Sequence, residues 1–517
     1  MNHWLVVPVV LPAFAGPLIV LAMRHDLVLQ RVFSTAATAA QLLLALWLLL
    51  QSMGGEIQVY RLGNWAAPFG IVLMLDRLAA LMLVLAGLLG LVIQLYAIGS
   101  GWDRRGRHFH SLWQFQLMGI NGAFLTGDAF NLFVLFEILL IASYGLMIHA
   151  GGELRLRAGV QYVVYNLLGS SLFLAALGTL YAVTGTLNMA DMAAKVAMLP
   201  AQDTALLRVG AVLLMLVFAV KAALVPLHFW LPATYARAPG PVAALFAIMT
   251  KVGIYGIIRF FTLVFPSDDA LMRFAADILL PAALVTLIVG QLGVLGARHM
   301  GRMTAFAAVG SVGTVMIAVA QFQPAGLAAG IWYLVHSTLA TAALFLAVDL
   351  IGTRRQGGSL WLRPAPPIVQ AGIVAAIYFA AAIAMAGLPP LSGFLGKLAV
   401  LQSVRGTDMT ALIWAVILIT SIFGIVGLTR AGSMVFWRAH ESGATPAPHA
   451  PDEPQPDEAG FPSAALALTS VGALIAAMAV LTVLAGPMMR FAQDTAAQLS
   501  DPQRYIEAVL ERQEGVK

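Results

Sequence analysis

Five ionisable residues lie in the middle of apolar segments that are long enough to cross a membrane. Glu137 interrupts FNLFVLFEILLIASYGLM, and Lys221, Lys251, His336 and Lys397 interrupt later segments. An ionisable side chain at the centre of a membrane helix costs about 2.5–3.5 kcal/mol on insertion scales, so such residues normally face a bundle interior or a hydrated path. As a set they favour a buried proton or ion relay. Taken singly, each could instead belong to a structural ion pair.

The chemistry of such a relay depends on how the charged groups meet. A Glu137–Lys221 contact that forms and breaks would change the affinity of the lysine for its proton, which is what a pump or an antiporter requires. His336, in WYLVHSTLATAALF, could bridge lysines through water as a neutral imidazole. This pattern predicts proton transfer along side chains inside the membrane.

Two of the lysines stand beside helix breakers. In VFAVKAALVPLHFWLP, Pro226 removes a helix amide shortly after Lys221, and in MAGLPPLSGFLGKLAV, Pro389 and Pro390 precede Lys397. Opened carbonyls inside a membrane are tolerated where they line a cavity or bind water. Broken helices at corresponding places in two antiparallel halves indicate inverted repeats, although the order of lysine and proline differs between the two.

Three further residues are candidates for proton entry or exit: His228, Tyr255 and Arg259. Lys251, Tyr255 and Arg259 fall at i, i+4 and i+8, on one helix face, which fits either a polar stripe toward an exit or packing against neighbouring helices. Arg259 lies near a segment end, where its stem could also snorkel to the interface. His228 lies two turns after Lys221 and could pass protons on, or simply be a satisfied histidine at a helix end.

Composition identifies the class of protein that holds these residues. Of 517 residues, 60% are hydrophobic and only 10% charged, far from the roughly 25% charged of a soluble domain. The chain is therefore expected to be an all-α, polytopic integral membrane protein. It has no cysteine, which excludes thiolate-held iron–sulfur clusters, cysteine-type zinc sites and disulfides. No cofactor and no metal site are expected.

The apolar pattern predicts about fourteen membrane spans of about 20 residues each. The first, MNHWLVVPVVLPAFAGPLIVLAM, lacks the features of a cleaved signal peptide and is interpreted as a retained span. The predicted spans are 3–23, 32–52, 72–99, 111–127, 130–150, 160–183, 206–229, 242–264, 275–297, 302–323, 326–350, 369–403, 411–436 and 464–486.

Charges near the span ends predict the orientation. Basic clusters such as WDRRGRHFH (102–110) follow the odd-numbered spans, so the positive-inside rule places both termini outside. That cluster is interpreted as an anchor rather than as a lipid or nucleic-acid site. Asp76 and Asp349, near span ends, are interpreted as interfacial or capping residues. The Pro-, Ala- and acid-rich stretch 441–460 predicts a disordered loop, and the tail after Pro487 a short surface helix.

Three stretches resemble a known family. FNLFVLFEILLIASY, KAALVPLHFWLPATYARAPGPVAALFAIMTKVGIYGIIR and AGLPPLSGFLGK are similar to the antiporter-like subunits shared by respiratory complex I and the Mrp multisubunit cation/proton antiporters. The sequence around Glu137 and the length of the chain most resemble those of the D-type subunit of Mrp, also called Pha or Mnh. The resemblance covers essentially the whole chain.

The resemblance implies a fourteen-helix fold with two inverted five-helix repeats. Its divisions would be an N-terminal three-helix segment (1–110), a first repeat (111–264), a second repeat (275–436), a disordered loop (437–463) and a last span with a polar tail (464–517). It assigns the relay roles to five residues: Glu137 modulates a lysine, Lys221 is that broken-helix lysine, Lys251 connects, His336 bridges and Lys397 is the exit.

The resemblance also implies a working context. The chain would be a proton-translocating subunit of a Na⁺ or K⁺/proton antiporter in the bacterial plasma membrane, a transporter subunit rather than an enzyme. Its partners would be subunits of the A, B, C, E, F and G types, with membrane lipid around them and no nucleic acid. The alternatives are a proton-pumping subunit of a redox complex (complex I or a membrane-bound hydrogenase), a purely structural subunit, and a membrane hydrolase using Glu137 or His228. The sequence contains no pair of metal ligands at helical spacing and no nucleophile elbow that would support the hydrolase.

Overall fold

The structure is a computed structural model that describes residues 2–200, 204–266, 269–355, 359–438 and 464–510. Most of the predicted loop 437–463 and the end of the predicted tail lie outside the described residues. Within them the chain is almost entirely helical, as the composition predicts, with one small hairpin of strands β1 (Gln58–Arg61) and β2 (Val72–Leu75).

The helices of the first half follow one another in chain order. They are η1 (His3–Leu5), α1 (Val7–Ala22), α2 (Leu27–Ser52), η2 (Leu62–Asn64), α3 (Arg77–Ser100), η3 (Trp102–Arg104), α4 (Phe109–Leu125), α5 (Ala129–Met147), α6 (Glu153–Thr184), α7 (Met189–Met198), α8 (Ala205–Ala222), α9 (Trp230–Arg237) and α10 (Gly240–Leu263). Those of the second half are α11 (Asp269–Gly296), α12 (Met300–Val319), α13 (Pro324–Arg354), α14 (Ala371–Ala386), α15 (Ser392–Ser403), α16 (Thr410–Phe436), α17 (Ala464–Val483), α18 (Ala485–Leu499) and α19 (Pro502–Leu510).

Each of the fourteen predicted spans contains a helix. Eleven helices of the described chain are long and apolar enough to cross a membrane: α2, α3, α5, α6, α8, α10, α11, α12, α13, α16 and α17. The predicted span 72–99 differs at its start, because residues 72–75 form β2 and pair with β1. Helix α3 begins only after Asp76, whose carboxylate accepts a hydrogen bond from the amide of Ala79 at 2.8 Å. The capping role predicted for Asp76 is therefore confirmed.

Both predicted helix breaks are present. Helix α8 ends at Ala222, Ala223 takes a left-handed conformation (φ 59°), and α9 begins at Trp230. Helix α14 ends at Ala386, Gly387 is left-handed (φ 74°), and α15 begins at Ser392. Proline cannot donate to the preceding turn and its ring clashes with it, so both breaks fall at the prolines that the sequence offers.

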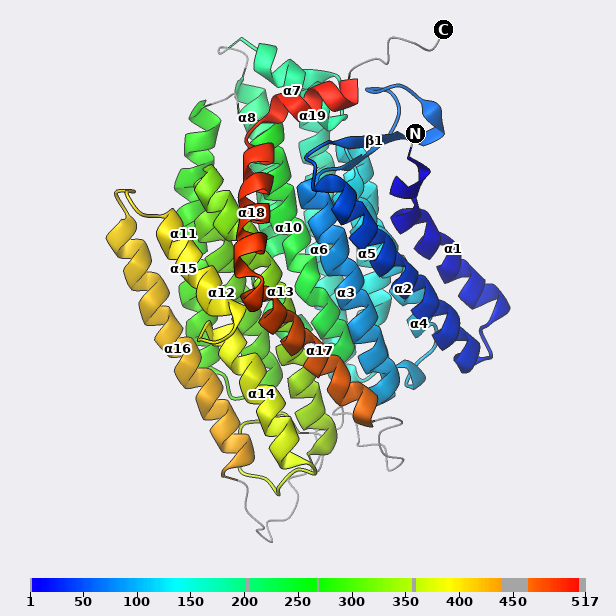
Figure 1. Cartoon of the computed structure of the whole chain (residues 1–517), viewed down its shortest axis with the longest axis vertical. Coiled ribbons are helices and arrows are strands. Elements are labelled where there is room, and N and C mark those ends of the chain that lie inside the picture. The colour runs from blue at the N-terminus through cyan, green and yellow to red at the C-terminus, as the bar shows by residue number, and fades with distance from the viewer. Residues whose placement is uncertain (1, 201–203, 267–268, 356–358, 439–463, 511–517) are drawn as a thin grey trace.

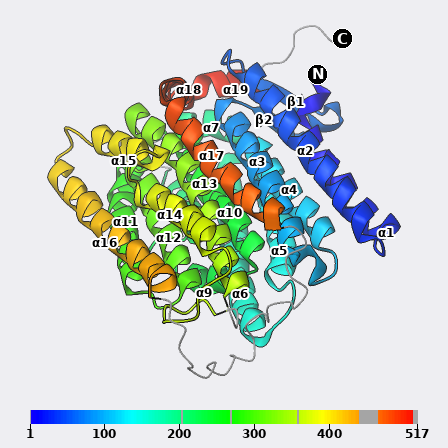
Figure 2. The ribbon, with the colours of Figure 1, turned by 60° about the horizontal axis from the view of Figure 1, so that its bottom comes forward.

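The helices form a bundle whose long axis is vertical in Figure 1. Helices α10 and α13 are its most completely buried spanning helices, whereas α1 and α16 lie at opposite edges. The hairpin, α7 and α19 gather at the upper end. In place of one short helix in the tail, α18 and α19 follow each other, and α18 packs on α13. Figure 2 shows α17 crossing obliquely over α13. The core of the bundle is thus the part that carries the predicted relay.

Candidate functional site

The five predicted relay residues come from five helices: α5 (Glu137), α8 (Lys221), α10 (Lys251), α13 (His336) and α15 (Lys397). Lys221, Lys251 and His336 are 4%, 0% and 1% exposed, while Glu137 and Lys397 are half-buried. Ionisable groups this deep in a helix bundle must be paired, solvated or uncharged. Their surroundings therefore decide what each can do.

Glu137 and Lys221 do not form a direct ion pair in the structure. The hydroxyl of Ser170 donates a hydrogen bond to Glu137, and the ammonium of Lys221 donates to Oδ1 of Asn166 at 3.2 Å. Asn166 and Ser170 are four residues apart in α6 and so share one face of that helix. Glu137 is nevertheless close enough to act electrostatically on Lys221. Helix α6 thus supplies a polar bridge between the acid and the lysine.

This bridge was not predicted from the sequence. The signal that could have indicated it is the pair of polar residues at i and i+4 in YNLLGSS (165–171), within an otherwise apolar span. Asn166 also donates from its amide to the carbonyl of Tyr162 at 2.8 Å, which leaves its Oδ1 oriented toward the lysine. The side chain of Asn166 is therefore held in place from both ends.

The bridge gives a direct prediction with an internal control. Ser170→Ala removes the hydroxyl that binds Glu137, whereas the neighbouring exposed hydroxyl of Ser171 bonds only to Leu167 in its own helix. Hydrogen bonds to charged groups contribute about 1.5–3 kcal/mol, so Ser170→Ala should lower cation-dependent proton transport in vesicles roughly tenfold. Ser171→Ala should transport like the wild type. Equal rates for the two variants would remove Ser170 from the path.

At the second break, the relay residues bind the opened backbone. The ammonium of Lys397 donates to the carbonyl of Ala386 at 2.7 Å and to the hydroxyl of Ser421 at 2.9 Å. Nε2 of His336 lies 3.2 Å from the carbonyl of Ala384, and its Nδ1 lies 2.9 Å from the hydroxyl of Ser392. Because a carbonyl only accepts, Nε2 carries a proton, and in the neutral imidazole Nδ1 then accepts from Ser392. The last turn of α14 thus orients both residues.

Lys251 has the fewest hydrogen-bond partners of the five residues. Its ammonium is fully buried and has no hydrogen-bond partner among the described residues. His336 lies within electrostatic range of both Lys251 and Lys397. The charges of both lysines therefore act on the histidine, although no direct hydrogen bond joins any of the three in the described chain.

Two of the three entry and exit candidates belong to a buried cluster. Arg259 forms a two-pronged ion pair with Asp76 (2.5 and 3.0 Å) and donates to the hydroxyl of Tyr255, which donates in turn to the carbonyl of Phe124 at 2.7 Å. The ring of Tyr505, from α19, lies 5.5 Å from the guanidinium. The interpretation of Arg259 as a snorkelling side chain is wrong, because its charge is neutralised inside the protein.

The predictions for Asp349 and His228 have different outcomes. Asp349 is not a cap: it lies within α13, accepts hydrogen bonds from Tyr96 (2.6 Å) and Trp102 (2.9 Å), and abuts Gly240 at the start of α10. His228 lies between α8 and α9, is 8% exposed, and its Nδ1 has no hydrogen-bond partner in the described part of the chain. A role for His228 in proton entry stays a prediction.

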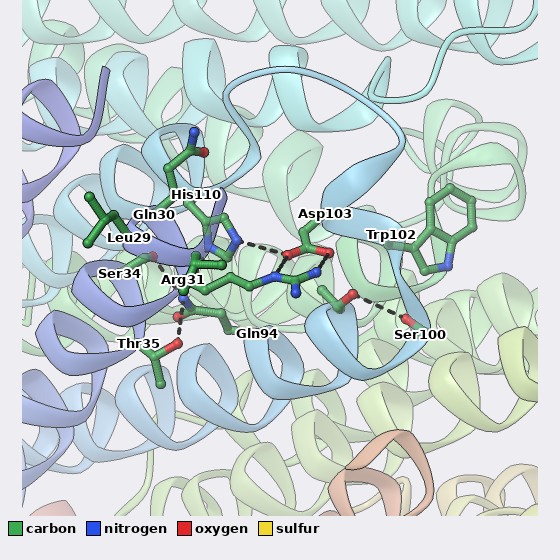
Figure 3. A network of polar contacts seen from close by, with 12 residues as sticks. Leu29, Gln30, Arg31, Ser34, Thr35, Gln94, Ser100, Trp102, Asp103 and His110 are labelled. Carbon is green, nitrogen blue, oxygen red and sulfur yellow. Dashed lines mark hydrogen bonds and ion pairs between the residues drawn. The ribbon is translucent and has the colours of Figure 1, made fainter. Parts of the chain in front are cut away.

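A second buried polar network lies among the first helices, where the sequence pattern indicated only an anchor. Arg31 donates to both oxygens of Asp103 (2.6 and 2.8 Å), His110 contacts the same carboxylate at 3.1 Å, and Gln94 links to Ser34 at 2.8 Å (Figure 3). Burial alone would raise the pKa of Asp103, but the hydrogen bonds from His110 and Arg31 hold that pKa below its ordinary value. The cluster 102–110 is thus partly structural.

Comparisons with known proteins show which family the chain resembles. Residues 126–424 match the family described as NADH:quinone oxidoreductase/Mrp antiporter, transmembrane. The chain is 37% identical to the D subunit of a probable K(+)/H(+) antiporter from Rhizobium meliloti (strain 1021), over 99% of this chain and 98% of that one. It is 36% identical to the D subunit of a Na(+)/H(+) antiporter from Bacillus subtilis (strain 168), over 99% and 100%.

A solved structure agrees with these relatives. In the Mrp complex from Dietzia sp. DQ12-45-1b, one chain superposes with a TM-score of 0.86 and 29% identity, covering 99% of this chain and 100% of that one. The chain belongs to the NADH:quinone oxidoreductase/Mrp antiporter transmembrane family and, within it, to the group of Mrp antiporter D subunits.

Proposed function

We propose that this chain is the proton-translocating D subunit of a multisubunit antiporter that exchanges protons for Na⁺ or K⁺. The observation that carries the proposal is the set of ionisable side chains from Glu137 to Lys397 inside the bundle, two of them next to broken helices. The related D subunits are named as parts of Na(+)/H(+) and K(+)/H(+) antiporters, which supports a monovalent cation as the exchanged ion.

The proposed mechanism starts at α6. When Glu137 is ionised, its field favours the ammonium form of Lys221, and Ser170 and Asn166 keep the two groups apart but coupled. A change at Glu137, driven by a partner subunit, weakens that field and lets Lys221 pass its proton toward Lys251. His336, with a proton on Nε2 and an acceptor at Nδ1, then connects Lys251 to Lys397. In this mechanism Lys251, which has no protein acceptor in the described chain, holds a proton only in transit.

The same proposal includes the overall architecture and setting. It has fourteen spans, with inverted repeats at 111–264 and 275–436 between the end segments 1–110 and 464–517, and both termini outside the bacterial plasma membrane. Partner subunits of the A, B, C, E, F and G types complete the antiporter. The similarity to a multisubunit Mrp complex supports such an assembly. The chain acts as a transporter subunit rather than as an enzyme.

One alternative has an observation in its favour. The matching family also includes NADH:quinone oxidoreductase subunits, so a proton-pumping role in a redox complex uses the same residues. Neighbouring genes distinguish the two: small antiporter subunits support the antiporter, and genes for iron–sulfur or quinone-site subunits support the redox complex.

The test is to express the whole operon in an antiporter-deficient strain and to measure pH changes in everted vesicles after adding Na⁺ or K⁺. Glu137→Ala and Lys397→Ala should both lose most of the cation-dependent signal. Lys195→Ala, which removes a surface lysine paired with Asp191 on α7, should keep it. If both relay variants exchange ions like the wild type, the proposed path is wrong.

A further inference from the structure

A basic cavity opens at the bundle end where α6 and α12 begin and α9 ends. Its volume is about 290 Å³, and Figure 2, turned so that this end comes forward, shows α9 beside α6. Three arginines and one histidine contribute to its wall, together with an amide and an indole: Arg157, Arg237, Arg302, His299, Gln161 and Trp361. None of these residues belongs to the proposed relay.

The charged side chains that line this cavity are all positive. No acidic side chain of the described residues lines it, and the nearest acid along α6, Glu153, is paired with Arg157 on the surface. His299 is 6% exposed, and burial together with the charges of Arg237 and Arg302 lowers the pKa of its imidazole to about 4. At neutral pH the imidazole is therefore uncharged, and the arginines supply the positive field.

His299 also offers a polar atom that nothing in the described chain occupies. Its Nδ1 is buried and has no hydrogen-bond partner there. His299 precedes the first residue of α12, whose N-terminus has no side-chain cap. Helix N-termini favour anions through their unpaired amides and the helix dipole. Arginine side chains add donors whose planar fork matches phosphate oxygens.

An apolar strip leads away from the cavity along the exposed face of α6. Val164 and Leu168 lie three and seven residues after Gln161, on the same face of α6, and are 59% and 58% exposed. Trp361, 42% exposed, stands at the cavity, and aromatic residues of this kind gather at the membrane–water interface. A charged head and an apolar stripe together match an amphipathic ligand.

We propose that this cavity binds the phosphate group of an anionic membrane phospholipid, whose acyl chain lies along α6. Basic pockets between membrane helices are established acceptors of such headgroups. The ligand would contact α6, which carries Asn166 and Ser170, and α9, which follows the break after Lys221. It would therefore brace the two elements that orient the lysine. The binding itself does not depend on the proposed transport function.

The test measures lipid binding to the full chain, purified with its co-expressed partners in a neutral detergent. Phosphatidylglycerol is titrated in, and the bound lipid is counted by native mass spectrometry, with phosphatidylcholine as the neutral comparison. Arg157→Gln/Arg302→Gln should weaken phosphatidylglycerol binding about tenfold or more, since each arginine near an anionic surface contributes about a factor of five. Phosphatidylcholine binding should stay unchanged.

The matched control is Arg104→Gln/Arg107→Gln. It removes two exposed arginines from the same end of the bundle, outside the cavity. Unchanged phosphatidylglycerol binding in the first double variant, or an equal loss in the control, overturns the proposal. Inorganic phosphate serves as a competitor. If it fails to displace the lipid, the phospholipid is the source of the bound phosphate group. If it displaces the lipid at comparable concentration, free phosphate is the ligand of the cavity. The single variant Arg302→Gln, at an exposed position, replaces the double variant if the latter does not fold.

Discussion

Replacing Lys221 with glutamine is expected to abolish cation-dependent proton transport while the complex still assembles. The side chain is 4% exposed, and its one hydrogen-bond acceptor in the described chain is Asn166. Glutamine has a similar length and can still donate to Asn166, but it cannot take up or release a proton. A positioned proton-transfer group contributes about 10²–10⁴-fold to a rate, so the vesicle signal should fall below detection.

Two further variants separate charge from packing. Lys221→Met removes both the proton and the hydrogen bond, and it should be equally inactive if the proton is what matters. Asn166→Leu keeps the lysine but removes its acceptor, so it should retain part of the activity with an altered dependence on pH. The amount of complex in the membrane, measured by immunoblot, checks assembly. Wild-type transport by Lys221→Gln would contradict the relay outright.

The broad architecture could be predicted from the sequence because it depends on local signals. Runs of about 20 apolar residues indicate spans, and Pro226, Pro389 and Pro390 each remove an amide that a continuous helix would use. The hairpin was missed because VLML (72–75) is as apolar as the span that follows it, and periodicity cannot separate four residues of strand from helix. Its pairing with Gln58–Arg61 depends on a contact across a turn.

The contacts around the site could not be predicted from the sequence, since they join residues that are far apart in the chain. Ser170 and Glu137 are 33 residues apart, and Lys221 and Asn166 are 55 apart. A single sequence shows that Glu137 and Lys221 are costly in a membrane, but not which polar groups of α6 stand between them. The same limit explains why Asp349 was interpreted as an interfacial or capping residue: its partners, Tyr96 and Trp102, are about 250 residues away.

The second large effect is expected at the ion pair between Asp76 and Arg259. Both side chains are almost completely buried, at 2% and 4% exposure, and they join α3 to α10 across 183 residues of sequence. Removing one partner of a buried pair leaves an uncompensated charge and costs about 3–5 kcal/mol. Asp76→Ala also removes the cap of α3, which adds about 1 kcal/mol. The purified complex should therefore unfold at a markedly lower temperature.

Three variants divide this loss into its parts. Asp76→Asn keeps an oxygen that can cap α3 but removes the charge, so it isolates the cost of the unpaired Arg259. Asp76→Ala/Arg259→Met removes both charges, and it should be more stable than Asp76→Ala alone, because no charge is then left buried without a partner. Asp501→Asn is the control, since its pair with Arg504 lies at the surface and should not change the unfolding temperature. If the double variant is the least stable of the set, the pair stabilises the fold by its own attraction. If Asp76→Ala unfolds like the wild type, the buried pair of Asp76 and Arg259 does not stabilise the fold.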